Sequence, residues 1–390
     1  MKILLGLTGS VASTLYEKLI TQLSVVGTVE SIVTHHAKNF IDLSVYKDHK
    51  LHSDYDEWSW RNNIKDDLGF GLNYRYNWEK GDRILHIELR DTASALVIAP
   101  CSANTLAKLA NGLCDNLLTC VARAWDFNRP LIIAPAMNTY MWEHPITQKH
   151  IAKLRSWGAK FVMPQSKMLA CKTEGMGAMA DIDKIVIAVQ ESLRWYFPLA
   201  MHANLTGEIP LRCPGIPIKS HPGSFLHKRK HHTHTGVDLY CDDGDTVKAV
   251  ENGKVVGIED FTGVKQKTPW WEDTQCILVE GATGVICYGE VIPGYTLKVG
   301  DKVQRGRTIG HVKRVLKIGE RKLKYPGHSE SMLHMEIYPH GKYMAFEELG
   351  TKPDSFDILI DPTPYLRTAT GAPKAVLTYE PKTSKDSNKT

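Results

Sequence analysis

The sequence contains no Cys-x-x-Cys pair and no apolar run of the roughly 20 residues that a membrane-spanning helix requires. Its eight cysteines are scattered along 390 residues, a chain long enough to build cores without disulfides, so we expect a reducing, cytoplasmic location. The formal net charge is only +5, and no internal repeat is visible. These absences predict that neither nucleic acid nor a membrane is a partner. The apolar opening lacks a clear cleavable stretch, so we interpret it as a first strand rather than a signal peptide.

The first half of the chain alternates short apolar strands with helical patterns. The strand candidates are KILLGLT, ESIVTHH, ALVIAP, LIIAP and KFVMP. Continuous apolar strands separated by helices predict an α/β fold whose parallel sheet is covered by helices on both faces. Residues 52–83 interrupt the pattern with Asp, Asn, Tyr and Trp, and we interpret them as a long excursion that serves as a lid or an interface loop.

The composition changes after about residue 198. Residues 198–230 repeat Pro and Gly without a helical period, which is typical of a linker or entry segment. Residues 231–368 have strand-like patterns and an Asn-Gly hairpin signal, and they predict an all-β domain with an antiparallel sheet. The polar residues 369–390 predict a disordered tail. The first domain accordingly spans residues 1–197.

Polar residues follow three of the predicted strands. Gly9 and Ser10 follow the first strand, Ser102 opens the segment after ALVIAPC, and Asn138 follows LIIAPAM. In parallel sheets, ligands bind beyond the carboxyl ends of the strands, where helix N-termini attract phosphate. Each residue also has an ordinary interpretation as a helix N-cap. Three such sites at one edge favour a phosphorylated ligand.

The run ALVIAPCSANTLAKLANGLCDNLLTCVARAWDFNRPLIIAPAMNTYMW, with GDRILHIELRDTAS before it and MLACKTEGMGAMAD after it, resembles the phosphopantothenoylcysteine decarboxylases of the flavin-dependent cysteine decarboxylase family. The resemblance covers roughly residues 1–195. It implies a flavodoxin-like fold and a homotrimer with FMN at the subunit interfaces. It also implies decarboxylation of 4′-phospho-N-pantothenoylcysteine to 4′-phosphopantetheine in coenzyme A biosynthesis.

The resemblance assigns roles residue by residue. His86, in HIELR, matches the active-site histidine, and Cys171 matches the flap cysteine that donates a proton late in the cycle. Asn138 and Met179 match substrate-binding positions, with Asn138 holding the carboxylate. The flap departs from the family's Cys-Gly-Asp pattern at Lys172. The positions that match FMN contacts are Gly9, Ser10, Val11, Thr34, Ser102, Ala103, Asn104 and Thr105.

The second half resembles the lysostaphin-type zinc endopeptidases in HTGVD and LHMEI. The resemblance implies that His234, Asp238 and His334 bind Zn²⁺. The two further histidines of the family are replaced by Met332 and Glu290, and methionine cannot transfer a proton. These replacements favour a zinc-binding domain without peptidase activity. A domain without any metal is the alternative.

Two other functions stay open for the whole chain. One is a non-catalytic regulatory flavoprotein of the same fold, although His86 is present. The other is a zinc-dependent cell-wall peptidase with a flavoprotein appendage, which would require export and the proton transfer that Met332 removes.

Overall fold

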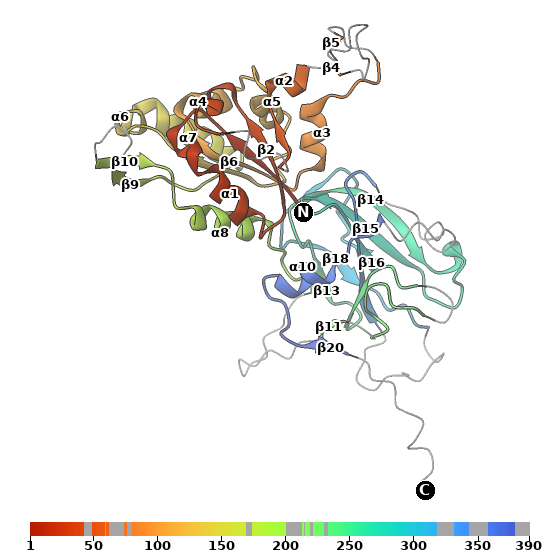
Figure 1. The fold of residues 1–390 in the computed structure, drawn as a ribbon. Coiled ribbons are helices and arrows are strands. Elements are labelled where there is room, and N and C mark those ends of the chain that lie inside the picture. The colour runs from red at the N-terminus through yellow and green to blue at the C-terminus, as the bar shows by residue number, and fades with distance from the viewer. Residues whose placement is uncertain are drawn as a thin grey trace, which may run out of the picture. The chain divides into compact units, whose positions relative to one another are not determined.

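The computed structural model describes residues 1–42, 49–58, 60–61, 74–75, 80–168, 174–199, 213, 215–218, 221–229, 233–317, 331–342 and 358–378. The chain divides into two compact units, Met1–Leu193 and Arg194–Thr390 (Figure 1). Among the described helices, none combines the length and the apolar character needed to span a bilayer.

The first unit is built on a six-stranded parallel sheet with the order β3-β2-β1-β6-β7-β8. This is a flavodoxin-like order with β3 as an additional edge strand, so the predicted fold class is confirmed. The central strands are buried almost throughout, which explains their continuous apolar sequences. The strands are β1 (Lys2–Leu7), β2 (Thr28–Val33), β3 (Leu51–His52), β6 (Ala95–Cys101), β7 (Leu131–Pro135) and β8 (Lys160–Phe161).

Helices cover the sheet (Figure 1). One pair is α1 (Tyr16–Leu23) with α8 (Ile182–Leu193), and two further pairs are α4 with α7 and α3 with α5. These latter helices bury apolar side chains in one core with strands β1, β2, β6 and β7. The remaining elements are η1 (Val11–Leu15), η2 (His35–Asn39), α2 (Asp54–Trp58), α3 (Leu85–Thr92), α4 (Ala103–Asn111), α5 (Leu117–Arg123), α6 (Thr139–Glu143), α7 (Pro145–Ser156) and the strand pairs β4 (Trp60–Arg61) with β5 (Tyr74–Arg75) and β9 (Gln165–Met168) with β10 (Glu174–Ala178).

The segment around His86 is helical. Residues Leu85–Thr92 form α3, in which Leu85 and Leu89 are buried one turn apart. Spacing of four residues places both leucines on one helical face, whereas in a strand the partly exposed Ile87 between them would share that face. Within the predicted excursion 52–83, the structure describes the short helix α2, whose Glu57 contacts His86.

The second unit contains an eight-stranded antiparallel sheet, as predicted. Its main path is β12-β19-β16-β15-β14-β17, and β18 joins β13 to β16. A two-stranded parallel pair, β11 with β20, and two helices complete the described elements. Their bounds are β11 (Ile216–Pro217), β12 (Val237–Cys241), β13 (Thr246–Lys248), β14 (Gly253–Thr262), η3 (Val264–Gln266), β15 (Thr274–Gly281), β16 (Val285–Pro293), β17 (Lys302–Val303), β18 (Thr308–Val312), β19 (Ser331–Tyr338), α10 (Thr363–Thr368) and β20 (Val376–Leu377).

The boundary between the units lies a few residues before the one inferred from composition. Trp195, Phe197 and Leu199 are buried in the core of the second unit, together with Cys213 and Ile216 from the predicted linker. Residues 369–378, predicted as part of a disordered tail, include β20; residues 379–390 lie outside the described residues.

Candidate functional site

A cavity of about 940 Å³ lies at the carboxyl ends of the parallel strands. Its walls include the turns after β1, β2, β6 and β7, strand β10 and Asp54 at the start of α2. The cavity therefore gathers residues that are far apart in the sequence, as the parallel topology requires. Among the lining residues are all the predicted FMN contacts and both predicted substrate contacts: Gly9, Ser10, Val11, Thr34, Ser102, Ala103, Asn104, Thr105, Asn138 and Met179.

Two of these residues also serve as helix N-caps. The Oγ of Ser102 accepts a hydrogen bond from the Thr105 backbone N–H at 3.3 Å, at the start of α4. The Oδ1 of Asn138 accepts one from the Tyr140 N–H at 2.9 Å, at the start of α6. Ser102 and Asn138 therefore each cap a helix and line the cavity. The first backbone N–H groups of α4 have no partner within the helix, which makes this end of α4 suited to an anion.

Strand β10 passes over the loop that follows β7. The Met137 N–H donates to the Gly177 carbonyl at 3.0 Å, and both residues line the cavity. Gly177 has φ +137°, and a Cβ added there would lie 2.2 Å from the Met137 carbonyl oxygen. Only glycine allows this close approach. Met179, next along the same segment, is buried. Cys171 lies outside the described residues.

His86 is not among the residues that line the cavity. It lies in the first turn of α3, and its side chain is about one quarter exposed. Its backbone N–H donates to Oε2 of the buried Glu57 at 2.9 Å, and its Nδ1 contacts Oε1 of the same carboxylate. The sequence does not predict the role of Glu57, because nothing in the local pattern links it to a histidine 29 positions away.

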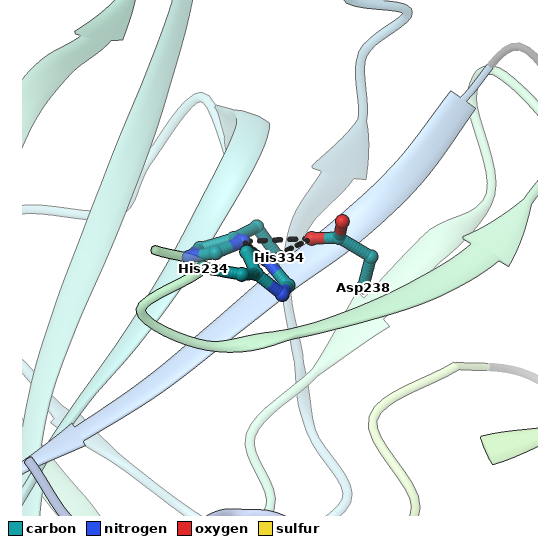
Figure 2. A group of neighbouring side chains, drawn as sticks. All are labelled: His234, Asp238 and His334. Carbon is teal, nitrogen blue, oxygen red and sulfur yellow. Dashed lines mark hydrogen bonds and ion pairs between the residues drawn. The ribbon is translucent and has the colours of Figure 1, made fainter. Parts of the chain in front are cut away.

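The second unit contains a group of three buried side chains that could bind a metal ion, at the positions that the sequence predicted. Asp238 on β12 is the cross-strand partner of His334 on β19, and His234 precedes β12. The Nε2 of His234 and the Nδ1 of His334 lie 2.9 and 2.8 Å from Oδ1 of Asp238, and 3.2 Å from each other. Figure 2 shows the three side chains pointing toward one another.

The outer nitrogens of both histidines are also engaged. The Nδ1 of His234 lies 2.9 Å from the Ser224 carbonyl oxygen, and the Nε2 of His334 lies 3.0 Å from a carboxylate oxygen of Glu336. With a metal ion bound, the outer nitrogens would keep their protons and the inner nitrogens would be lone-pair donors, the usual arrangement around a bound metal. Burial lowers the pKa of His234. Burial alone would also lower the pKa of His334, but its hydrogen bonds to Asp238 and Glu336 outweigh that effect and raise it to about 10.

Two further groups belong to this centre. Arg229 forms an ion pair with Oδ2 of Asp238, the oxygen that does not face the histidines. Glu290 is buried, and its Oε2 has no hydrogen-bond partner within the described part of the chain. Burial and the negative charge of Asp238 raise the pKa of Glu290 to about 8. Glu290 has φ +63° at an irregularity in β16, next to Gly289, which pairs with His334. Strained backbone of this kind often occurs at functional sites.

Comparison with known proteins divides the chain in the same way. Residues 1–194 match the family Flavoprotein, and residues 232–346 match Peptidase family M23. The first half is 45% identical over 182 residues to a phosphopantothenoylcysteine decarboxylase of Oryza sativa subsp. japonica, covering 46% of this chain and 75% of that protein. It is 42% identical over 198 residues to the corresponding enzyme of Mus musculus, covering 49% and 87%. A solved structure of the FMN binding protein AtHal3 is 43% identical, with a TM-score of 0.42, covering 49% of this chain and 95% of that one.

Proposed function

Through residues 1–194 the chain belongs to the flavoprotein family that includes the phosphopantothenoylcysteine decarboxylases, and from that membership we propose that it decarboxylates 4′-phospho-N-pantothenoylcysteine to 4′-phosphopantetheine with bound FMN. The observation that carries the proposal is the cavity at the carboxyl ends of the strands. One wall presents the phosphate-binding turns, and another presents Asn138. A cytoplasmic location stays a prediction.

The cavity suits FMN in its shape and its donors. The turn at Gly9 and the N-terminus of α4 offer backbone N–H groups to a phosphate, and the volume accommodates a flavin. A Cβ at Gly9 would lie 2.6 Å from the Cβ of His36, so glycine keeps this turn close to the neighbouring strand end. Bound FMN supplies a hydride acceptor for the substrate thiol and thereby the electron sink that loss of CO₂ requires.

The protein's own groups bind and protonate the substrate. Because Oδ1 of Asn138 caps α6, its amide NH₂ is the group that donates to the substrate carboxylate. A neutral amide holds the carboxylate without the positive charge that would retain it. His86 orients the substrate or removes its proton. Cys171 donates the final proton.

A homotrimer reconciles these roles with the position of His86, since a second copy can supply the histidine that the cavity of a single chain lacks. Co-expression of His86→Asn with Asn138→Ala tests this. Each variant is inactive alone, but a mixed trimer contains sites that combine an intact cavity with an intact His86. Random assembly regenerates about a quarter of the sites. Absence of any regained activity in mixed trimers would contradict shared sites.

Activity itself is tested with purified chain and 4′-phospho-N-pantothenoylcysteine, with mass spectrometry to identify the product. The expected product is 4′-phosphopantetheine from the wild type and none from His86→Asn. His311→Asn, a substitution of an exposed histidine in the second unit, is the matched control. A flavin-bound wild type that forms no product would support the regulatory alternative. An enethiol product would mean that Cys171 delivers no proton.

For the second unit we propose a zinc-binding domain without peptidase activity. The convergence of His234, Asp238 and His334 supports metal binding, and the donor set of two imidazoles and a carboxylate suits zinc. The replacement of the family's other histidines by Met332 and Glu290 argues against hydrolysis. Elemental analysis should find one zinc per chain, lost in His234→Ala. Release of peptides from peptidoglycan by the wild type but not by His234→Ala would overturn the inactive assignment.

A further inference from the structure

Two of the three carboxylates of helix α2, Asp54 and Glu57, lie one turn apart, and each binds the start of another helix. Oδ1 of Asp54 accepts a hydrogen bond from the Leu117 N–H at 2.8 Å, at the start of α5. Glu57 accepts one from the His86 N–H at the start of α3. The Ile84 N-cap of α3 provides no side-chain acceptor, so Glu57 takes that role.

The second contact of Glu57 is not needed for capping. Its Oε1 contacts Nδ1 of the His86 imidazole, while its Oε2 receives the backbone N–H. One carboxylate thus fixes both the backbone and the ring of the same residue. An ionised carboxylate only accepts hydrogen bonds, so the proton of a neutral ring lies on Nδ1 and the lone pair lies on Nε2.

The two side chains of this pair differ in their exposure to solvent. The Glu57 side chain is 4% exposed, whereas the His86 side chain is 26% exposed. The carboxylate is therefore inside the unit, and part of the ring is accessible. A carboxylate that holds a histidine in one tautomer and one orientation is a recurrent arrangement in proton-transfer sites.

We propose that Glu57 is the positioning residue for His86: it holds the imidazole with Nε2 available to the substrate. This assignment rests on the proposed decarboxylase function. It also means that α2 contributes residues to two different sites. Asp54 lines the cavity of its own chain, while Glu57, one turn further on, holds a histidine that this cavity lacks. In the proposed trimer, α2 links the wall of one site to the histidine of another.

The alternative is that Glu57 is only a helix cap, and Glu57→Gln separates the two roles. The glutamine carbonyl can still accept the His86 N–H, so the cap survives. Its amide NH₂ then faces Nδ1 and favours the opposite tautomer, with the proton on Nε2. Glu88→Gln is the matched control, because Glu88 lies in α3 but pairs with Arg83 at the surface.

For the FMN-loaded full chain, we expect Glu57→Gln to lower kcat about 100-fold, because a misplaced general acid–base loses most of its contribution, with little change in KM. Thermal stability and flavin content should match those of Glu88→Gln, which retains wild-type kcat. Solid-state ¹⁵N NMR of histidine-labelled protein, assigned with His86→Asn, should find the His86 proton on Nδ1 in the wild type and on Nε2 in Glu57→Gln.

Equal kcat in Glu57→Gln and Glu88→Gln would overturn the proposal, and so would a neutral wild-type His86 with its proton on Nε2. If Glu57→Gln does not fold, the wild-type tautomer decides the question. A wild type that forms no product would contradict the proposed function, while the NMR measurement would still test the role of Glu57.

Discussion

Gly177→Ala should disable the flavin cavity without unfolding the first unit. An added Cβ would lie 2.2 Å from the Met137 carbonyl oxygen, whereas such atoms normally stay more than 3.0 Å apart. The two backbones must therefore separate by about 1 Å, which stretches the 3.0 Å bond from the Met137 N–H to the Gly177 carbonyl beyond hydrogen-bonding range.

The energetic cost has two parts. The lost hydrogen bond is worth about 1 kcal/mol, and the positive φ adds about 1–2 kcal/mol for a residue with a side chain. A total of about 2–3 kcal/mol is less than the stability of a typical domain, so the unit stays folded. The displacement nevertheless moves Asn138 and strand β10, and misplacement of about 1 Å can lower the rate by about 100-fold.

Gly158→Ala is the matched control. Gly158 also has a positive φ, +107°, but within the described residues the atom nearest to its added Cβ is the Phe127 carbonyl oxygen, 3.9 Å away. This variant should lose about 1–2 kcal/mol of stability and keep its turnover. The assay compares kcat, flavin content and urea midpoints of both variants. Wild-type turnover in Gly177→Ala, or an equal loss of turnover in Gly158→Ala, would refute the argument from close approach.

Three further predictions concern the second unit. Zinc at 100 times its Kd should stabilise it by about 2.7 kcal/mol, and a chelator should remove that gain from the wild type but not from His234→Ala, as thermal melting would show. Burial raises the pKa of Glu251 from its ordinary 4.5 to about 7, so the folded state keeps a proton that the unfolded state has lost. Stability should then fall by about 3 kcal/mol as pH rises from 4.5 to 7, and urea midpoints of Glu251→Gln should vary less over that range. If peptidase activity is absent because two histidines are missing, the double variant Met332→His, Glu290→His should hydrolyse peptidoglycan peptides when zinc is bound, and the wild type should not.

Much of the cavity could be predicted from the sequence because the parallel topology brings the lining residues together. Once β1, β6 and β7 are identified as buried strands, their following residues must meet at one edge, so Ser102 and Asn138 are brought together by topology alone. The three metal ligands could be predicted only through the family resemblance, since His334 lies 96 residues beyond Asp238.

Other features depend on contacts that no local pattern encodes. The two-residue strand β3 is too short for a periodic signal. The pairing of Glu57 with His86 crosses a segment of irregular composition, so neither residue predicts the other. Trp195, Phe197 and Leu199 alternate as a strand would, but the boundary predicted at residue 197 divides them, because the Pro and Gly of residues 198–230 favour a linker.

Both units use a buried carboxylate to hold a histidine ring, but for different purposes. At α3, a buried carboxylate of Glu57 holds the ring of a histidine whose other side is accessible. At β19, the carboxylate of Glu336 holds the ring of His334, but that histidine is itself buried and faces Asp238. An accessible nitrogen suits transient proton transfer, and a buried one directed at a second ligand suits a permanently bound ion. Covalent linkage adds a consequence: the proposed trimer presents three copies of the second unit, so a ligand that is itself multivalent can bind by avidity. The decarboxylase oligomer would then determine how strongly the second unit holds such a ligand.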